Sequence, residues 1–241
     1  METAFLNYTF YLLLVFPILL FAKKKSANFW QYLLVFIFFF ILNQAMLDLP
    51  RYYKGLQFIH GNWNWSGKIF TIAASVLFLV LYRGLTAKDV GLTLRQKGSL
   101  KLPLILVFIF ILVPTILGGV LISAEELDLE TLAFQLTMPT LDEELAYRGI
   151  MLALLNKAVC HSKLFRGISV ANLVTSLLFG FVHALSLTAG FSVSFEPLYF
   201  AQTFLFALGL AYIVEQTGSL LLPALAHSLG NFLPNLVAML K

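Results

Sequence analysis

The chain has 241 residues and a formal net charge of +4, with 60% hydrophobic and only 12% charged residues. Soluble domains carry about 25% charged residues, so this composition, with a mean hydropathy of +0.88, excludes a soluble domain. The single cysteine, Cys160, excludes an intrachain disulfide and any site built from several cysteine ligands. The positive charges lie in loops beside apolar stretches, which favours anchoring to anionic lipid over nucleic-acid binding.

Apolar stretches follow one another along the whole chain. A transmembrane helix needs about 20 mostly apolar residues. The hydrophobic runs predict helices at Phe5–Ala22, Phe29–Leu47, Ile69–Tyr82, Leu102–Ile122, Thr140–Val159, Ile168–Leu187, Leu198–Val214 and Leu220–Leu240. No room remains for a separate soluble domain. We therefore expect an all-α polytopic fold with about eight transmembrane helices, forming one integral-membrane domain over residues 1–241 in the plasma or inner membrane.

The loop charges predict an orientation. With eight spans, eleven basic loop residues share one side of the membrane. The opposite side collects four basic residues and the acidic segment 125–130. The positive-inside rule then places both termini outside the cytoplasm.

The fifth predicted helix carries an acidic motif. Charged side chains at bilayer depth cost about 2.5 kcal/mol or more each, so Glu143, Glu144 and Arg148 together indicate function or tight pairing. Glu144 and Arg148 are spaced i,i+4 and are expected to pair on one helix face. Glu143 points about 100° away and is free to face another helix.

The later helices add two histidine motifs. Phe179 and His183 are spaced i,i+4, so the aromatic ring is expected to pack on the imidazole. His227 and Asn231 share a helix face, where an imidazole N–H and an amide N–H can form an oxyanion hole. The alternative for these residues is structural hydrogen bonding between helices.

Proline predicts where the fifth helix begins. Pro139 disfavours helix at the residue before it, so the helix is expected to begin at Thr140, with Glu143 in its first turn. A capping box between Thr140 and Glu143 is then an alternative role for that glutamate. At about 1.5 Å rise per residue, Glu143 and the polar residues of the two later motifs are expected in the same half of the bilayer.

The three motifs together resemble a known signature. They follow one another as Glu143-Glu144-x-x-x-Arg148, Phe179-x-x-x-His183 and His227-x-x-x-Asn231. This pattern resembles the CPBP intramembrane endopeptidases, which include type II CAAX prenyl endopeptidases and Abi-like bacteriocin-processing or immunity proteins. The resemblance covers a catalytic-type core at about residues 140–235. It implies a glutamate-dependent intramembrane protease of all-helical, eight-helix type that hydrolyses a peptide bond in CAAX-like or leader-peptide processing.

The resemblance also implies a role for each motif residue. Glu143 and His183 would activate the water, while His227 and Asn231 would hold the oxyanion. Glu144 and Arg148 would form the structural pair, in agreement with their spacing, and Phe179 would support the site. Prenyl endopeptidases cut on the cytosolic side, whereas the loop charges place this site in the outer half of the bilayer.

A metal site is the alternative chemistry. Glu143, His183 and His227 could hold zinc as a His₂Glu set with an open position for water. The chain has no His-Glu-x-x-His motif, and Asn231 is a poor zinc ligand, so we expect no cofactor. The expected partners are membrane lipid and a peptide or protein substrate, and not nucleic acid.

Two rival functions follow from the same residues. Intramembrane Glu, Arg and His also form proton paths in transporters, although paired broken helices in two related halves are absent from this sequence. A non-catalytic membrane binding or immunity protein would keep the fold and work by association. The sequence leaves open the substrate, whether it is prenylated, the oligomeric state and the choice between catalysis and binding.

Overall fold

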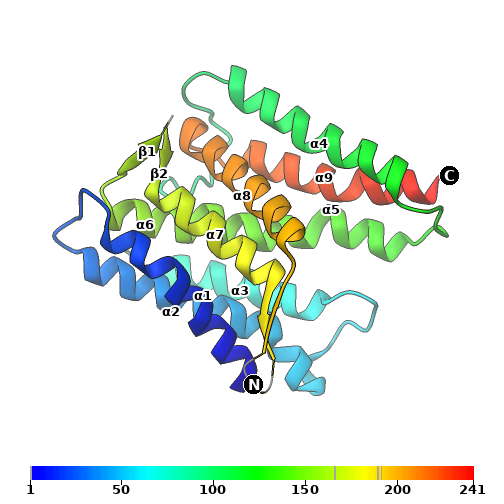
Figure 1. The fold of residues 1–241 in the computed structure, drawn as a ribbon, viewed down its shortest axis with the longest axis horizontal. Helices are drawn as coiled ribbons and strands as arrows, with labels where there is room; N and C mark the ends of the chain where they lie inside the picture. The colour runs from blue at the N-terminus through cyan, green and yellow to red at the C-terminus, as the bar shows by residue number, and fades with distance from the viewer. Residues whose placement is uncertain (1, 166, 189, 191) are drawn as a thin grey trace.

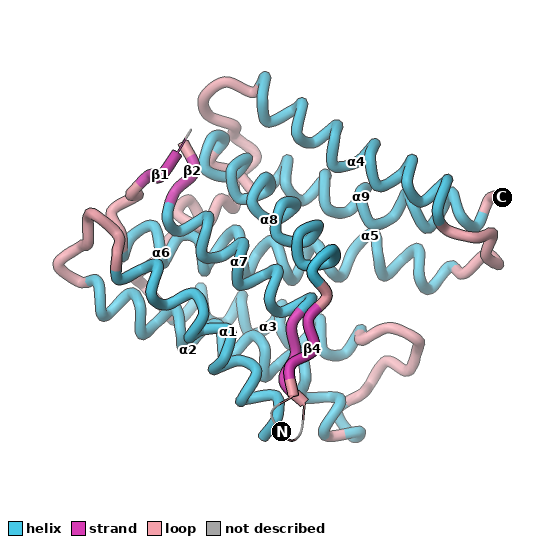
Figure 2. The backbone as a smooth tube through the Cα atoms, in the orientation of Figure 1, coloured by secondary structure: helices cyan, strands magenta, loops and turns pink. Residues whose placement is uncertain are grey.

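The computed structural model describes residues 2–165, 167–188, 190 and 192–241 and is mostly helical (Figures 1 and 2). The helices are α1 (Glu2–Leu20), α2 (Phe29–Tyr52), the 3₁₀ turn η1 (Lys54–Leu56), α3 (Trp65–Leu81), α4 (Lys101–Leu121), α5 (Leu129–Glu143), the π-helix η2 (Glu144–Met151), α6 (Leu152–Ala158), α7 (Val170–Ala184), α8 (Pro197–Thr217) and α9 (Leu221–Met239). The strands are β1 (Lys163–Phe165), β2 (Ile168–Ser169), β3 (Leu185–Leu187) and β4 (Val193–Phe195).

One long helical column runs through the middle of the molecule. The elements α5, η2 and α6 are continuous over residues 129–158, so the described residues form eight helical columns. The α5 half packs against α9 and α3, and the α6 half packs against α2 and α7. Figure 1 shows α4 and α9 on one side of this column and α1 to α3 on the other. The column therefore contacts both groups of helices that surround it.

The start of this column corrects the sequence-based expectation. The helix begins at Leu129, where the side chain of Asp128 caps it by accepting from the backbone N–H groups of Glu130 (2.9 Å) and Thr131 (3.2 Å). Pro139 lies inside α5 and is buried. Proline removes one backbone hydrogen bond, and packing against neighbouring helices maintains the rest of the helix. The predicted break at Pro139 is therefore wrong.

Because the helix begins earlier, Glu143 does not lie at its start. Glu143 is the last residue of the 15-residue helix α5, and the π-helix follows it directly. It therefore lies about 21 Å along the column at ~1.5 Å per residue, not in a first turn. A capping box between Thr140 and Glu143 is excluded, because both residues lie within the helix.

Two short hairpins flank α7, and the sequence reading missed them. The predicted helix Ile168–Leu187 is shorter than expected, because residues 168–169 pair with β1 and residues 185–187 pair with β4. Strands of two or three residues are too short to produce a periodic pattern. The hydroxyl of Tyr11 donates to the Leu185 carbonyl at 2.5 Å and ties the second hairpin to α1.

The outer surface is apolar, as a lipid-facing surface must be. Among the described residues, four helices are long and apolar enough to cross a membrane: α1, α2, α4 and α8. The helices α3 and α7 are shorter apolar segments. Only 6% of the apolar window of α4 is buried inside the protein, so lipid must cover most of it. The expected all-α polytopic membrane fold is confirmed.

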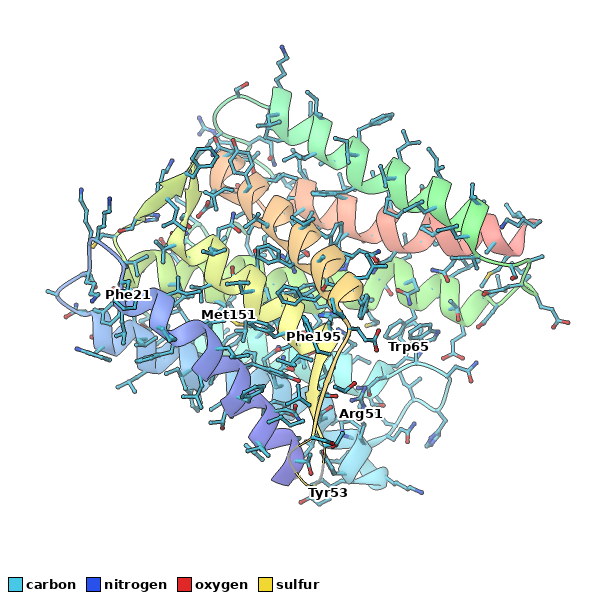
Figure 3. All side chains as sticks on the ribbon, viewed as in Figure 1. Phe21, Arg51, Tyr53, Trp65, Met151 and Phe195 are labelled. Atoms are coloured by element: carbon cyan, nitrogen blue, oxygen red, sulfur yellow. The ribbon has the colours of Figure 1, made fainter. Side chains whose placement is uncertain are left out.

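The interior contrasts with this surface. Phe36, Phe39 and Phe40 of α2 are fully buried beneath the central column. Met151 at the end of η2 is also fully buried, whereas Phe21 is 85% exposed at the edge of the molecule (Figure 3). Large hydrophobic side chains therefore fill the core between α2 and the central column.

Helices α4 and α9 approach each other through small residues. A Cβ atom on Gly230 of α9 would lie 2.7 Å from the carbonyl oxygen of Phe110 in α4. A Cβ atom on Gly118 of α4 would lie 2.7 Å from the Cβ of Pro234 in α9. Both positions need glycine because the two backbones are in close contact.

Candidate active site

The second glutamate of the acidic motif holds a histidine from another helix. Glu144 Oε1 lies 2.7 Å from His227 Nδ1, and Arg148 Nη1 lies 3.2 Å from the same oxygen. The side chains of these three residues are between 2% and 4% exposed. The contact with Arg148 is an ion pair without hydrogen-bond geometry. The expected i,i+4 ion pair is present, and His227 shares its carboxylate.

The contact with Glu144 orients the imidazole of His227. A carboxylate only accepts hydrogen bonds, so Nδ1–H of His227 is the donor. The other ring nitrogen, Nε2, lies 3.8 Å from Glu143 Oε2. Phe206 of α8 packs edge-on against the ring, with centroids 5.3 Å apart. Glu144 therefore fixes the ring so that Nε2 faces Glu143.

The first glutamate has a partner that the sequence reading missed. Lys68 Nζ donates to Glu143 Oε1 at 2.7 Å and to Asp142 Oδ2 at 2.9 Å. The helix predicted at Ile69–Tyr82 begins earlier in the structure, because α3 begins at Trp65 and includes Lys68 in its first turn. The Asn64 side chain caps this helix by accepting from Gly67 N–H at 3.1 Å. An asparagine before an apolar run is a helix-start signal that the sequence does contain.

His183 is held by an aromatic ring and a backbone carbonyl. Its Nδ1 lies 2.8 Å from the carbonyl oxygen of Phe179, and the two rings are 4.2 Å apart. The expected packing of Phe179 on His183 is present. The guanidinium of Arg148 lies 4.3 Å from the centroid of the same Phe179 ring. Phe179 thus connects the Glu144–Arg148 pair to His183.

The four predicted catalytic residues line one cavity. Its volume is about 1470 Å³, and its walls include Glu143, His183, His227 and Asn231. Three helical columns contribute these side chains, namely α5 with η2, α7 and α9. Helix α4 supplies an apolar wall that includes Phe110. Residues up to 88 positions apart in the sequence (143 to 231) therefore line the same cavity.

Further polar side chains support the acidic segment from α2. Asn43 Nδ2 donates to Asp142 Oδ1 at 3.4 Å, and Gln44 Nε2 donates to Asn43 Oδ1 at 3.2 Å. Gln44 Nε2 also donates to the Tyr147 hydroxyl at 3.2 Å. All of these residues are buried. Asp142 could have been noticed as the first of three consecutive acidic residues, but nothing local indicated the contacts with α2.

The side chains do not form a metal-binding set. Within the described part of the chain, no group of three or more His, Cys, Asp or Glu side chains is arranged to hold a metal ion. The Lys68 ammonium is bonded to Glu143 Oε1, where it competes with any cation for that carboxylate. In this geometry Glu143, His183 and His227 are not arranged as such a group.

Comparison with known proteins identifies the family. Residues 100–233, more than half of the chain, match the model of the type II CAAX prenyl endopeptidase Rce1-like family. The chain belongs to this family. Rce1-like proteins are proteases, so membership supports an intramembrane CAAX-type endopeptidase that works in lipid on a peptide or protein substrate. No curated protein and no solved structure matches the chain. The Rce1-like segment contains all the predicted site residues. It excludes α1, α2 and α3, and Lys68 lies in α3.

Proposed function

We propose that this Rce1-like chain is an intramembrane endopeptidase that hydrolyses CAAX-type substrates with a water molecule activated by Glu143. The observation that carries the proposal is that Glu143, His183, His227 and Asn231 line one cavity. Its volume of about 1470 Å³ exceeds the roughly 300–1,000 Å³ of small-ligand pockets. A cavity of this size favours an extended peptide over a small molecule.

Water activation requires one base and one orienting group. Glu143 Oε1 is bonded to Lys68, so Oε2 is the oxygen placed to take a proton from water. The carbonyl of Phe179 only accepts, so His183 donates to it through Nδ1–H. In the neutral imidazole Nε2 is then an acceptor for the second hydrogen of the water. A positioned base of this kind contributes about 10²–10⁴-fold to the rate.

The same water then attacks the substrate. Its oxygen bonds to the carbonyl carbon of the scissile peptide, and the π electrons move to the carbonyl oxygen. The Asn231 amide donates to this oxyanion, and so does Nε2–H of His227 when the imidazole is protonated. The carbonyl re-forms as the C–N bond breaks, and the leaving amine takes the proton from Glu143. Glu144 acts only through His227, whose Nδ1 it holds.

We further propose that this reaction uses no metal. The contact between Lys68 and Glu143 supports this, because a lysine ammonium neutralises the carboxylate that zinc would need. Prolonged dialysis of the reconstituted protein against a chelator is expected to leave the cleavage rate unchanged. A rate that falls on dialysis and returns with added zinc would instead support the His₂Glu arrangement.

The direct test compares wild-type protein with Glu143→Gln in liposomes. The probe is a prenylated CAAX-type peptide with a fluorophore and a quencher on opposite sides of the scissile bond. Glu143→Gln is expected to lose about 10²–10⁴-fold in rate, while the Lys68–Asp142 contact preserves the fold. Full activity of this variant would contradict the proposal.

A second measurement identifies natural substrates. Membrane proteomes of wild-type and Glu143→Gln cells are compared for a precursor that accumulates only in the variant. If the accumulating precursor carries a leader peptide, the natural reaction is leader-peptide processing and not cleavage of CAAX-type substrates. Wild-type function retained in Glu143→Gln cells would favour a non-catalytic binding protein.

A further inference from the structure

A buried lysine connects an unmatched part of the chain to the catalytic glutamate. Lys68 lies in the first turn of α3, outside the Rce1-like segment 100–233, and its side chain is 10% exposed. Its Nζ bonds to Asp142 and Glu143, which are consecutive residues near the middle of the central column. One ammonium therefore bridges two adjacent carboxylates.

The two carboxylates differ in what else they contact. Asp142 is 2% exposed and accepts from Asn43 through its other oxygen. Glu143 directs its other oxygen toward His227 and lines the cavity. Both residues line the cavity, but Asp142 accepts a hydrogen bond on each oxygen, whereas Glu143 is held on one oxygen and directs the other into the site.

This arrangement fixes the orientation of Glu143. A carboxylate can rotate about its side-chain torsions, which are broad for a terminal sp² group. The contact from Lys68 at 2.7 Å anchors Oε1 and leaves Oε2 in a single direction. A misplacement of 1 Å at a reacting group can lower a rate by about 10²-fold. Loss of this anchor therefore lowers catalysis even if the fold is kept.

The charge of Lys68 matters as well as its shape. A nearby cation favours the ionised form of a carboxylate, and a second carboxylate beside it disfavours that form. Without Lys68, Asp142 and Glu143 would be two adjacent buried acids with no ammonium between them. A neutral side chain of equal length would fill the space but would not keep Glu143 ready to accept a proton.

We propose that Lys68 is a positioning residue of the reaction, which holds Glu143 with Oε2 toward His227 and the water, with Asp142 as the counterion that holds Lys68 in place. This inference rests on the proposed function. It makes α3 part of the catalytic apparatus, although the site residues recognised from the sequence all lie after residue 139.

The test replaces the lysine and restores its charge chemically. Cys160 is the only cysteine of the chain and is exposed, so Lys68→Cys is made in a Cys160→Ser background. Treatment with 2-bromoethylamine adds an ammonium at nearly the reach of lysine, and iodoacetamide adds a neutral amide of similar size. Lys68 lines the cavity, which gives the reagents a path. Mass spectrometry measures the extent of each modification.

The readout is kcat and KM for the prenylated CAAX-type peptide. Lys68→Cys is expected to lose about 10²-fold in kcat with KM changed little. Aminoethylation is expected to restore kcat by at least about tenfold, and iodoacetamide to restore none of it. Equal recovery with both reagents would show that Lys68 only fills space, and unchanged kcat in Lys68→Cys would show that it has no role.

Variants that need no chemical step keep the test decisive if Lys68→Cys fails to fold. Lys68→Arg is expected to keep kcat within about tenfold of wild type, and Lys68→Gln to lose about 10²-fold. Equal kcat in these two variants would overturn the positioning role. The proposed function fails separately, through wild-type activity in Glu143→Gln or through no cleavage by the wild-type protein.

Discussion

His227 Nδ1 lies 2.7 Å from Glu144 Oε1, so the two adjacent glutamates of the acidic motif serve different partners. Glu144 contacts His227 and Arg148 through one oxygen, and the residue is only 2% exposed. Glu143 contacts Lys68 and lines the cavity. Of the two consecutive glutamates, Glu144 therefore contacts only buried protein groups, and Glu143 faces the cavity.

This division predicts that replacing Glu144 destabilises the protein far more than replacing Glu143. Glu144→Ala leaves Arg148 without its buried partner and His227 without its acceptor. Breaking a buried ion pair by removing one partner costs about 3–5 kcal/mol, so we expect a large fall in the thermal unfolding temperature in detergent. Glu143→Gln is the matched control, because Asp142 still pairs with Lys68. Similar unfolding temperatures for Glu144→Ala and wild type would contradict the assignment.

Asn231 is predicted to act on the rate alone. It lines the cavity one helical turn after His227, where its amide can donate to the oxyanion. Removing one oxyanion donor lowers kcat by about 10²–10³-fold. We expect this loss in Asn231→Ala, with little change in KM or unfolding temperature. Asn235→Ala is the control. Asn235 lies one turn further on, and its amide already donates to the Asn231 backbone carbonyl, so no oxyanion role is expected for it. Equal kcat values for the two variants would argue against an oxyanion role.

We predict that Gly230 is required for the close packing of α9 against α4, which forms the apolar wall of the cavity. A Cβ atom at this position would lie 2.7 Å from the Phe110 carbonyl oxygen, which is backbone and cannot rotate away. Overpacking of this kind typically costs about 1–3 kcal/mol. Gly230→Ala is therefore expected to lower the unfolding temperature by displacing α4 from α9. Gly55→Ala is the control, since a Cβ there meets no atom within 4 Å. No difference between the two variants would refute the close contact.

Most helices were predictable because hydrophobic runs are a local signal. The spans predicted at Phe29–Leu47 and Leu102–Ile122 correspond closely to α2 and α4. The i,i+4 contacts between Glu144 and Arg148, and between Phe179 and His183, were also predictable because helix geometry alone brings such residues together.

Contacts between distant segments were not predictable in this way. Lys68 is 74 positions from Asp142, and no periodicity relates them. The local preference of Pro139 predicts a helix break, but the cap at Asp128 and the packing of α5 keep the helix continuous through it. The π-helix η2 has no sequence signal that separates it from an ordinary α-helix.

That π-helix sets the rotational phase between the two halves of the central column. Each residue of an α-helix advances the chain by about 100°, and the wider turns of η2 change the total rotation between α5 and α6. If the same eight residues formed a regular α-helix, α5 would be rotated relative to α6, and Glu143 would turn away from Lys68 and His227 while the α6 half kept its packing. An irregular stretch of helix thus determines the direction in which the Glu143 carboxylate points.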